Sequence, residues 1–189
     1  MTGFIIILYK LYCFAVLLSE MEKFRNKYRI PSARLKGFDY SQNGLYFITI
    51  NTNNHKSIFG DIIDGSVDNI ISPKMILSEA GKIVSDCWYD LPNHYPNIIL
   101  DEFIIMPDHI HGIIKIENRS DIKAKHGLSE FIRAFKSFSS RRINELRKTK
   151  NPDIWQQRFY DRIIRSNREL NNIRLYIKNN PVKYNKNAI

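Results

Sequence analysis

Two histidines separated by a single residue, His109 and His111, are the clearest chemical feature of the 189-residue sequence. They stand in the apolar run 104–114, and alternate residues of a β-strand point to the same face. Burying two imidazoles without partners costs free energy. A metal ion or phosphate shared by both rings would explain them. The alternative is one core histidine and one exposed histidine.

A second candidate group lies near the end of the chain. Tyr176 and Asn180 are four residues apart on a helix predicted over 166–180, so they share one face. Ser166 and Glu169 match a capping box at its start. Tyr176 stands beside the apolar stripe of this helix, which leaves its hydroxyl available for chemistry. The alternative is a boundary aromatic at Tyr176 and a helix C-cap at Asn180.

The remaining pattern predicts the elements that must position these residues. Period-two alternation predicts a strand over 44–50. Runs of strand-favouring residues predict further strands over 98–106, 109–116 and 156–165, and a short strand is predicted over 58–64 with a turn at 64–66. Helical spacing predicts helices over 78–89 and from Leu128 onward, the latter with an apolar face at 128, 131, 132, 135 and 138. This mixture predicts one α+β domain with a central antiparallel sheet and helices packed on it.

The charge is concentrated in the C-terminal part of the chain. Residues 1–118 hold 11 Lys/Arg and 13 Asp/Glu, whereas residues 119–189 hold 18 Lys/Arg and 6 Asp/Glu, a net charge of +12. This imbalance favours an anionic partner such as a nucleic acid, the alternative being a solvated basic face. The candidate DNA-binding residues are Arg133, Lys136, Arg141, Arg158, Arg162 and Arg165.

The first twenty residues differ from the rest. Their apolar run is short, is interrupted by Lys10 and lacks the features of a signal peptide. We interpret residues 1–20 as a mis-started extension before Met21 and residues 21–189 as the domain; a membrane anchor is the alternative. Cys13 and Cys87 form no metal or redox motif, so a cytoplasmic protein without stable membrane association is expected.

Three segments together resemble a known family. Met106–Ile114 resembles the HUH motif of single-tyrosine transposases, in which two histidines flank a hydrophobic residue. Trp155–Arg165 and Tyr176–Lys183 resemble the C-terminal signature of the REP-associated tyrosine transposases. The resemblance covers residues 22–184 and implies the HUH endonuclease fold, with a ferredoxin-like core.

The resemblance also implies roles for individual residues. His109 and His111 become metal ligands, Tyr176 the nucleophile, and Asn180 a third ligand in a place where other members carry glutamine. The implied cofactor is Mg²⁺ or Mn²⁺, with no organic cofactor. The implied reaction cleaves and rejoins single-stranded or hairpin DNA, such as REP-like palindromes, through a covalent 5′-phosphotyrosine. The protein would act as a monomer or homodimer.

Other interpretations remain open. Tyr160 is a rival nucleophile, although it lies in a predicted strand without a metal-binding partner at helical spacing. The chain could instead be a non-catalytic nucleic-acid-binding protein that kept the fold, or a phosphodiesterase that uses water. Relaxases and rolling-circle replication initiators share the HUH fold, but the Tyr-x-x-x-Asn-Pro ending fits the REP-associated branch better.

Overall fold

The computed structural model describes residues 23–24, 27–28, 35, 37–67, 70–119, 126–149 and 153–186. The chain divides into two units, Met1–Leu35 and Lys36–Ile189. In the first unit, β1 (Lys23–Phe24) pairs antiparallel with β2 (Lys27–Tyr28). The interpretation of residues 1–20 as an extension concerns residues outside the described part of the chain. All elements below belong to the second unit.

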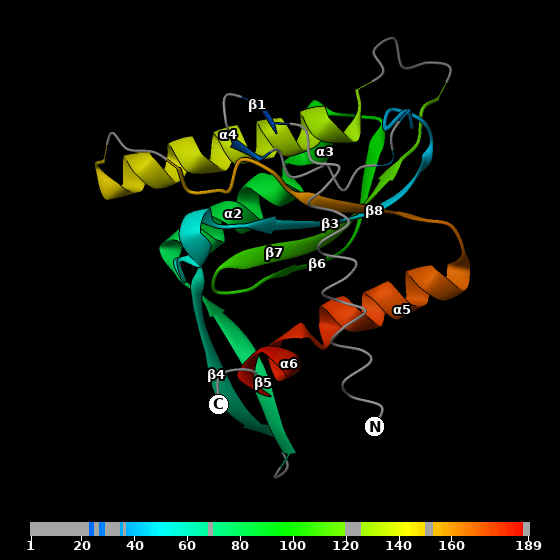
Figure 1. The fold of residues 1–189 in the computed structure, drawn as a ribbon. Helices are drawn as coiled ribbons and strands as arrows, with labels where there is room; N and C mark the ends of the chain where they lie inside the picture. The colour runs from blue at the N-terminus through cyan, green and yellow to red at the C-terminus, as the bar shows by residue number, and fades with distance from the viewer. Residues whose placement is uncertain are drawn as a thin grey trace. The chain divides into compact units, whose positions relative to one another are not determined.

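Four antiparallel strands in the order β6-β7-β3-β8 form its central sheet (Figure 1). These are β3 (Gly44–Asn51), β6 (Ile98–Ile105), β7 (His109–Ile116) and β8 (Tyr160–Ile164). The sheet and its helices confirm the predicted α+β class and the strand pair that carries the histidines. The strand predicted over 156–165 begins later, at Tyr160, because the carbonyls of residues 156–158 accept from the ammonium of Lys136 instead.

Helices α2 (Glu79–Tyr89) and α4 (Leu128–Arg147) cover one face of this sheet (Figure 1). Their apolar sides pack on Tyr46, Ile48 and Ile50 of β3, all of which are fully buried. Both helices were predicted from their apolar spacing. The prediction that Phe138 belongs to the buried face of α4 is wrong, because its side chain is 44% exposed. A short helix, α3 (Leu91–His94), was not expected; Pro92 lies in its first turn.

Gly112, which follows the histidine pair on β7, has a packing reason to be glycine. The Trp88 indole of α2 lies so close that a Cβ at position 112 would be 2.6 Å from it. The same indole stacks on Phe103 of β6, with ring centroids 4.5 Å apart and planes 6° apart. Glycine therefore lets α2 seat directly on the back of the strand whose other face carries His111.

Helix α5 (Asn167–Lys178) covers the opposite face of the sheet (Figure 1). Leu170 and Ile177 of this helix pack against Phe47, Ile113 and Ile164. The predicted cap is confirmed, since the Ser166 hydroxyl accepts from the backbone N–H of Glu169. The helix was predicted to reach residue 180 with Tyr176 and Asn180 on one face, and that prediction is wrong. The helix ends at Lys178, before Pro181, and Asn180 begins the next helix, so the two residues do not share a helix.

The proline then opens another helix, α6 (Asn180–Lys186), because its missing N–H and fixed φ suit the first turn. A long hairpin, β4 (Gly60–Val67) and β5 (Ile70–Leu77), contacts α6. Neither α6 nor β5 was expected, and the predicted turn at 64–66 is wrong. Residues 64–66 pair with residues 71–73 as ladder positions.

Two further features complete the second unit. The segment between β3 and β4 contains a single 3₁₀ turn, η1 (Asn53–His55). No helix in the described part of the chain is both long and apolar enough to cross a membrane.

Candidate active site

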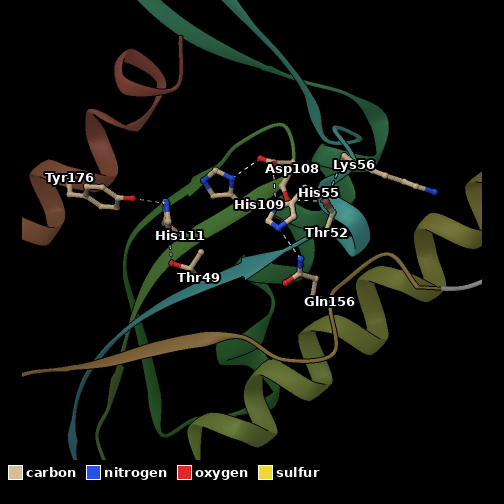
Figure 2. Close-up of polar contacts among 9 residues, drawn as sticks. All are labelled: Thr49, Thr52, His55, Lys56, Asp108, His109, His111, Gln156 and Tyr176. Carbon is tan, nitrogen blue, oxygen red and sulfur yellow. Dashed lines mark hydrogen bonds and ion pairs between the residues drawn. The ribbon is translucent and has the colours of Figure 1, made fainter. Parts of the chain in front are cut away.

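His109 and His111 project from β7 toward the face of the sheet that α5 covers (Figure 2). Their ring centroids lie 4.7 Å apart, with the planes at 70°. His111 is only 5% exposed, and the side chain of His109 is 16% exposed. The shared face and close approach follow from the two-residue period of the strand. The structure therefore brings the two predicted histidines together.

Each nitrogen of His111 has a partner. Its Nδ1 lies 2.8 Å from Oγ1 of Thr49, the residue directly opposite on β3, and its Nε2 lies 3.3 Å from the hydroxyl of Tyr176. Burial, and then the neighbouring His109, lowers the pKa of His111 to about 3, so the ring is neutral near pH 7. Both partners are hydroxyl groups, which donate as well as accept, so either tautomer of the neutral ring satisfies the two contacts.

His109 is oriented by the residue that precedes it. The carboxylate of Asp108 lies 2.7 Å from Nδ1 of His109. Because a carboxylate only accepts hydrogen bonds, Nδ1 carries a proton in this contact, and Nε2 is left for another partner. Metal-binding histidines commonly hold one ring nitrogen against an oxygen partner and bind the metal through the other.

Tyr176 stands at the end of a short aromatic array. Its ring lies edge-on to Phe47, with centroids 6.1 Å apart, and 5.2 Å from the ring of His111. The ammonium of Lys183 lies 5.0 Å from its ring centroid, a cation–π distance. Tyr176 remains 38% exposed. Its hydroxyl is thus directed at His111 while part of the ring stays open to solvent.

Two ion pairs hold the helix that carries Tyr176. A register shift in β6 between Leu100 and Phe103 lets two consecutive carboxylates reach α5. Asp101 accepts from the guanidinium of Arg174, at 2.8 Å from Nε, and Glu102 pairs with Lys178 at 2.8 Å. The hydrogen bonds from Arg174 lower the pKa of Asp101 below its usual range. These pairs flank Tyr176 and fix the helix against the edge strand.

Asn180 begins α6 and is buried, at 6% exposed. Tyr184 lies one helical turn further on, so the two share a face of α6. The ring centroid of Tyr184 is 6.3 Å from that of His109. This helix face is therefore directed toward the histidine pair, and Asn180 as a ligand stays a prediction.

The six basic residues predicted to bind DNA fall on two surfaces. Arg133 and Arg141 are exposed on the outer side of α4, across the sheet from Tyr176. Arg158, Arg162 and Arg165 are exposed in or beside β8, where Arg162 pairs with Glu169 at 2.7 Å. The structure does not gather these residues into one track.

Lys136 binds the backbone of the loop before β8. Its ammonium lies 2.8 to 3.4 Å from the carbonyl oxygens of Gln156, Gln157 and Arg158, so it anchors the loop that leads into β8. An ammonium has three donors, and three acceptors surround this one. Its contribution to DNA binding stays a prediction.

Tyr160, the rival nucleophile, lies at the start of β8 and is 46% exposed. Its ring centroid is 6.4 Å from that of Phe47, and Phe47 also contacts the rings of His111 and Tyr176. Within the described residues it is Tyr176, not Tyr160, whose hydroxyl is paired with a histidine of the motif.

The donor set is compatible with a divalent cation. Among the described residues, no group of three or more His, Cys, Asp or Glu side chains is arranged to hold a metal. A site built on the histidine pair therefore needs a neutral oxygen donor such as the Asn180 amide, with water or phosphate oxygens. Two imidazoles whose Nδ1 atoms each lie within hydrogen-bonding distance of an oxygen fit that requirement.

Comparison with known proteins places this fold and site in a family. The family model described as "Transposase IS200 like" matches residues 78–180, more than half of the chain and a range that contains the histidine pair, Tyr176 and Asn180. An uncharacterized protein of Haemophilus influenzae is 33% identical over 174 residues, which cover 84% of this chain and 91% of that one. The chain belongs to the IS200-like transposase family.

Two further relatives refine the placement. A Haemophilus influenzae protein named "Putative REP-associated tyrosine transposase" is 28% identical over 151 residues. The match covers 77% of this chain and 74% of that one. The solved structure of a REP-associated tyrosine transposase bound to a REP hairpin has a TM-score of 0.55 and 18% identity, covering 87% of this chain and 74% of that one. That structure confirms the fold, and the two names agree with the resemblance found in the sequence.

Sequence reasoning missed two side chains that orient the histidines, Thr49 and Asp108. The strand pattern puts Thr49 on the face opposite Ile48 and Ile50, which is a usable signal. Its pairing with His111 depends on the register of two strands 62 residues apart in sequence. Asp108 was predicted only as part of the turn between two strands.

Proposed function

We propose that this chain is a metal-dependent DNA transposase that cleaves and rejoins single-stranded or hairpin DNA through a phosphotyrosine at Tyr176. The observation that carries the proposal is the approach of the Tyr176 hydroxyl to Nε2 of His111, 3.3 Å apart, although they lie 65 residues apart in sequence. A nucleophile beside two metal-ligand side chains is the constellation that this reaction needs.

The chemistry assigns a task to each group. Tyr176 loses its phenolic proton to solvent, its oxygen forms a bond to phosphorus, and the bond from phosphorus to the 3′-oxygen breaks. The leaving 3′-oxygen takes up a proton from solvent. The DNA is left with a free 3′-hydroxyl on one side and a 5′-phosphotyrosine on the other. A bound Mg²⁺ or Mn²⁺, held by His109, His111 and Asn180, would polarise the phosphoryl oxygens. A second 3′-hydroxyl can then reverse the step without ATP, because the phosphoester is conserved.

Tyr176 needs help because a phenol with a pKa near 10 is mostly protonated at neutral pH. Fixed geometry supplies part of that help. The two ion pairs of α5 and the edge contact with Phe47 hold the ring in place, so little conformational entropy is lost when the phosphate arrives. Hairpin or single-stranded DNA is the proposed substrate class, and the solved relative bound to a REP hairpin supports it.

The test is denaturing electrophoresis with hairpin DNA that carries a randomised single-stranded flank, in Mn²⁺ or Mg²⁺. A 3′-label should appear on a slow protein–DNA adduct, and a 5′-label on a shortened strand that polymerase can extend. Cleavage without an adduct would establish water as the nucleophile. Binding without cleavage in either metal would establish the non-catalytic alternative.

A further inference from the structure

The carboxylate of Asp108 contacts two histidines from different segments of the chain (Figure 2). Its Oδ1 lies 2.7 Å from Nδ1 of His109, and its Oδ2 lies 3.5 Å from Nδ1 of His55. The side chain of Asp108 is 16% exposed, so these contacts are partly shielded from water. His55 belongs to η1, more than fifty residues away in sequence, and has no place in the HUH motif.

His55 is itself held from its other side. Its Nε2 lies 3.1 Å from Nε2 of Gln156, which belongs to the loop before β8. An amide nitrogen only donates and a carboxylate only accepts. Nε2 of His55 must therefore accept, and its ring proton must be on Nδ1, toward Asp108. The requirements from the two ends agree: the Gln156 amide donates to His55, the Nδ1 proton of His55 faces the Asp108 carboxylate, and Nδ1 of His109 donates to that carboxylate.

The backbone around this chain of contacts is firmly fixed. Thr52 is fully buried, and its N–H and hydroxyl both lie within hydrogen-bonding distance of the Asp108 carbonyl. The N–H of Gln156 donates to the carbonyl of Asn51 at 2.9 Å. His55 itself has a φ of 51°, a left-handed conformation that costs a non-glycine residue about 1 kcal/mol or more. Tertiary contacts thus hold His55 in an unfavourable conformation that places it between Asp108 and Gln156.

We propose that Asp108 is a positioning residue for His109, and that His55 and Gln156 hold Asp108 in place. Together they keep His109 in the Nδ1-protonated tautomer, with the Nε2 lone pair directed into the site. The proton on Nδ1 follows from the contact with the carboxylate, which only accepts. The consequence for metal binding rests on the proposed function.

The first measurement is the tautomer of His109 in the metal-free full chain, from two-bond ¹H–¹⁵N NMR of ¹⁵N-histidine protein. We expect Nδ1-protonated His109 and His55 in the wild type. Asp108→Ala should release His109 into a mixture of tautomers, and Asp108→Asn should largely restore it, because the amide oxygen still accepts. His55→Ala should have a smaller effect in the same direction. Nε2-protonated His109 in the wild type would overturn the proposal.

The second measurement is Mn²⁺ affinity by electron paramagnetic resonance, which needs no DNA. Asp108→Ala should weaken Mn²⁺ binding by about 10- to 100-fold, the usual loss when the residue that orients a ligand is removed. The matched control is the exposed His94–Asp90 pair, 3.0 Å apart, where Asp90→Ala should change nothing. Unchanged affinity in Asp108→Ala would overturn the positioning role.

The two proposals fail in different ways. If the wild type binds Mn²⁺ and shows the expected tautomers but forms no adduct with DNA, the proposed function fails and the positioning role stands. If the adduct forms while Asp108→Ala keeps both the tautomer and the affinity, the positioning role fails alone. Should Asp108→Ala not fold, His55→Ala and Gln156→Ala test the same contacts from the exposed end.

Discussion

At the scale of single residues, the proposed function makes the hydroxyl of Tyr176 the atom on which the reaction depends. Tyr176→Phe removes one oxygen and keeps the contact with Phe47, so melting temperature and DNA affinity should survive. Cleavage and the protein–DNA adduct should both vanish in the electrophoresis assay. Tyr160→Phe is the matched control and should stay active. An adduct that persists in Tyr176→Phe but disappears in Tyr160→Phe would identify Tyr160 as the nucleophile.

The three predicted ligands should respond in graded fashion. His109→Ala and His111→Ala should abolish cleavage through loss of the metal, with partial rescue of one of them at high Mn²⁺. Asn180→Ala should do milder damage, because water can replace one neutral oxygen donor. Titration of activity against Mn²⁺ separates these cases. A loss in Asn180→Ala as complete as in the histidine variants would assign the residue a larger role.

How far the site was predictable differs from residue to residue. Tyr176, His109 and His111 could be found because each lies in a short motif with its own spacing. Thr49, His55 and Gln156 could not, because what brings them to the histidines is strand register and loop packing between distant segments. Lys136 was predicted on charge alone, and charge does not reveal that the carbonyls of a neighbouring loop occupy its ammonium group.

At the scale of elements, the ion pairs of α5 predict a pH-dependent stability. Arg174 lowers the pKa of Asp101 in the folded protein. The ionised Asp101 therefore stabilises the fold above the unfolded-state pKa of about 4, and this stabilisation is lost as pH falls through the lower pKa of the folded state. A double-mutant cycle of Asp101→Asn and Arg174→Ala, by urea unfolding, should give a coupling of at most about 1 kcal/mol at pH 7, since the pair is partly exposed. The coupling should shrink toward pH 3, and a coupling that grows there would contradict this account.

Gly112 tests how α2 supports the histidine strand. Gly112→Ala places a methyl group 2.6 Å from the Trp88 ring, and overpacking of this kind costs about 1–3 kcal/mol. Urea unfolding should show that loss. Gly127→Ala is the control, since its nearest contact is 3.3 Å and a loss below about 1 kcal/mol is expected. Equal losses at both positions would mean that the Trp88 contact is not the cause.

Elements with a clear period were predictable, and the β4–β5 hairpin was not. Its second strand contains Pro73, and proline usually argues against a strand. A two-stranded ribbon leaves each strand with an outer edge, so the missing N–H costs little there. Asp64, Gly65 and Ser66 form a good turn sequence locally, but pairing with β5 overrides that preference.

At the scale of the whole molecule, DNA binding should depend strongly on salt, because residues 119–189 carry a net charge of +12. Removing one cation that binds a phosphate should reduce the slope of log affinity against log salt by about 0.7 for single strands. We expect the triple variant Arg158→Ala, Arg162→Ala and Arg165→Ala to flatten the slope more than the double variant Arg133→Ala and Arg141→Ala. Arg133 and Arg141 lie across the sheet from Tyr176. The reverse ranking would place the DNA over α4. Lys136→Ala is tested separately, by thermal unfolding, because it should mainly destabilise the loop.

The contact between Tyr176 and His111 joins two residues of one and the same chain. One polypeptide thus brings the proposed nucleophile and one proposed ligand together, and under the proposed function we expect activity per molecule not to depend on protein concentration. Mixing the Tyr176→Phe and His111→Ala variants should accordingly yield no cleavage, because neither chain then has both the tyrosine hydroxyl and the histidine in one site. In a cell that makes both forms, an inactive copy should compete for DNA without disabling the intact one. Recovery of activity in the mixture would show that chains exchange their tyrosine helices.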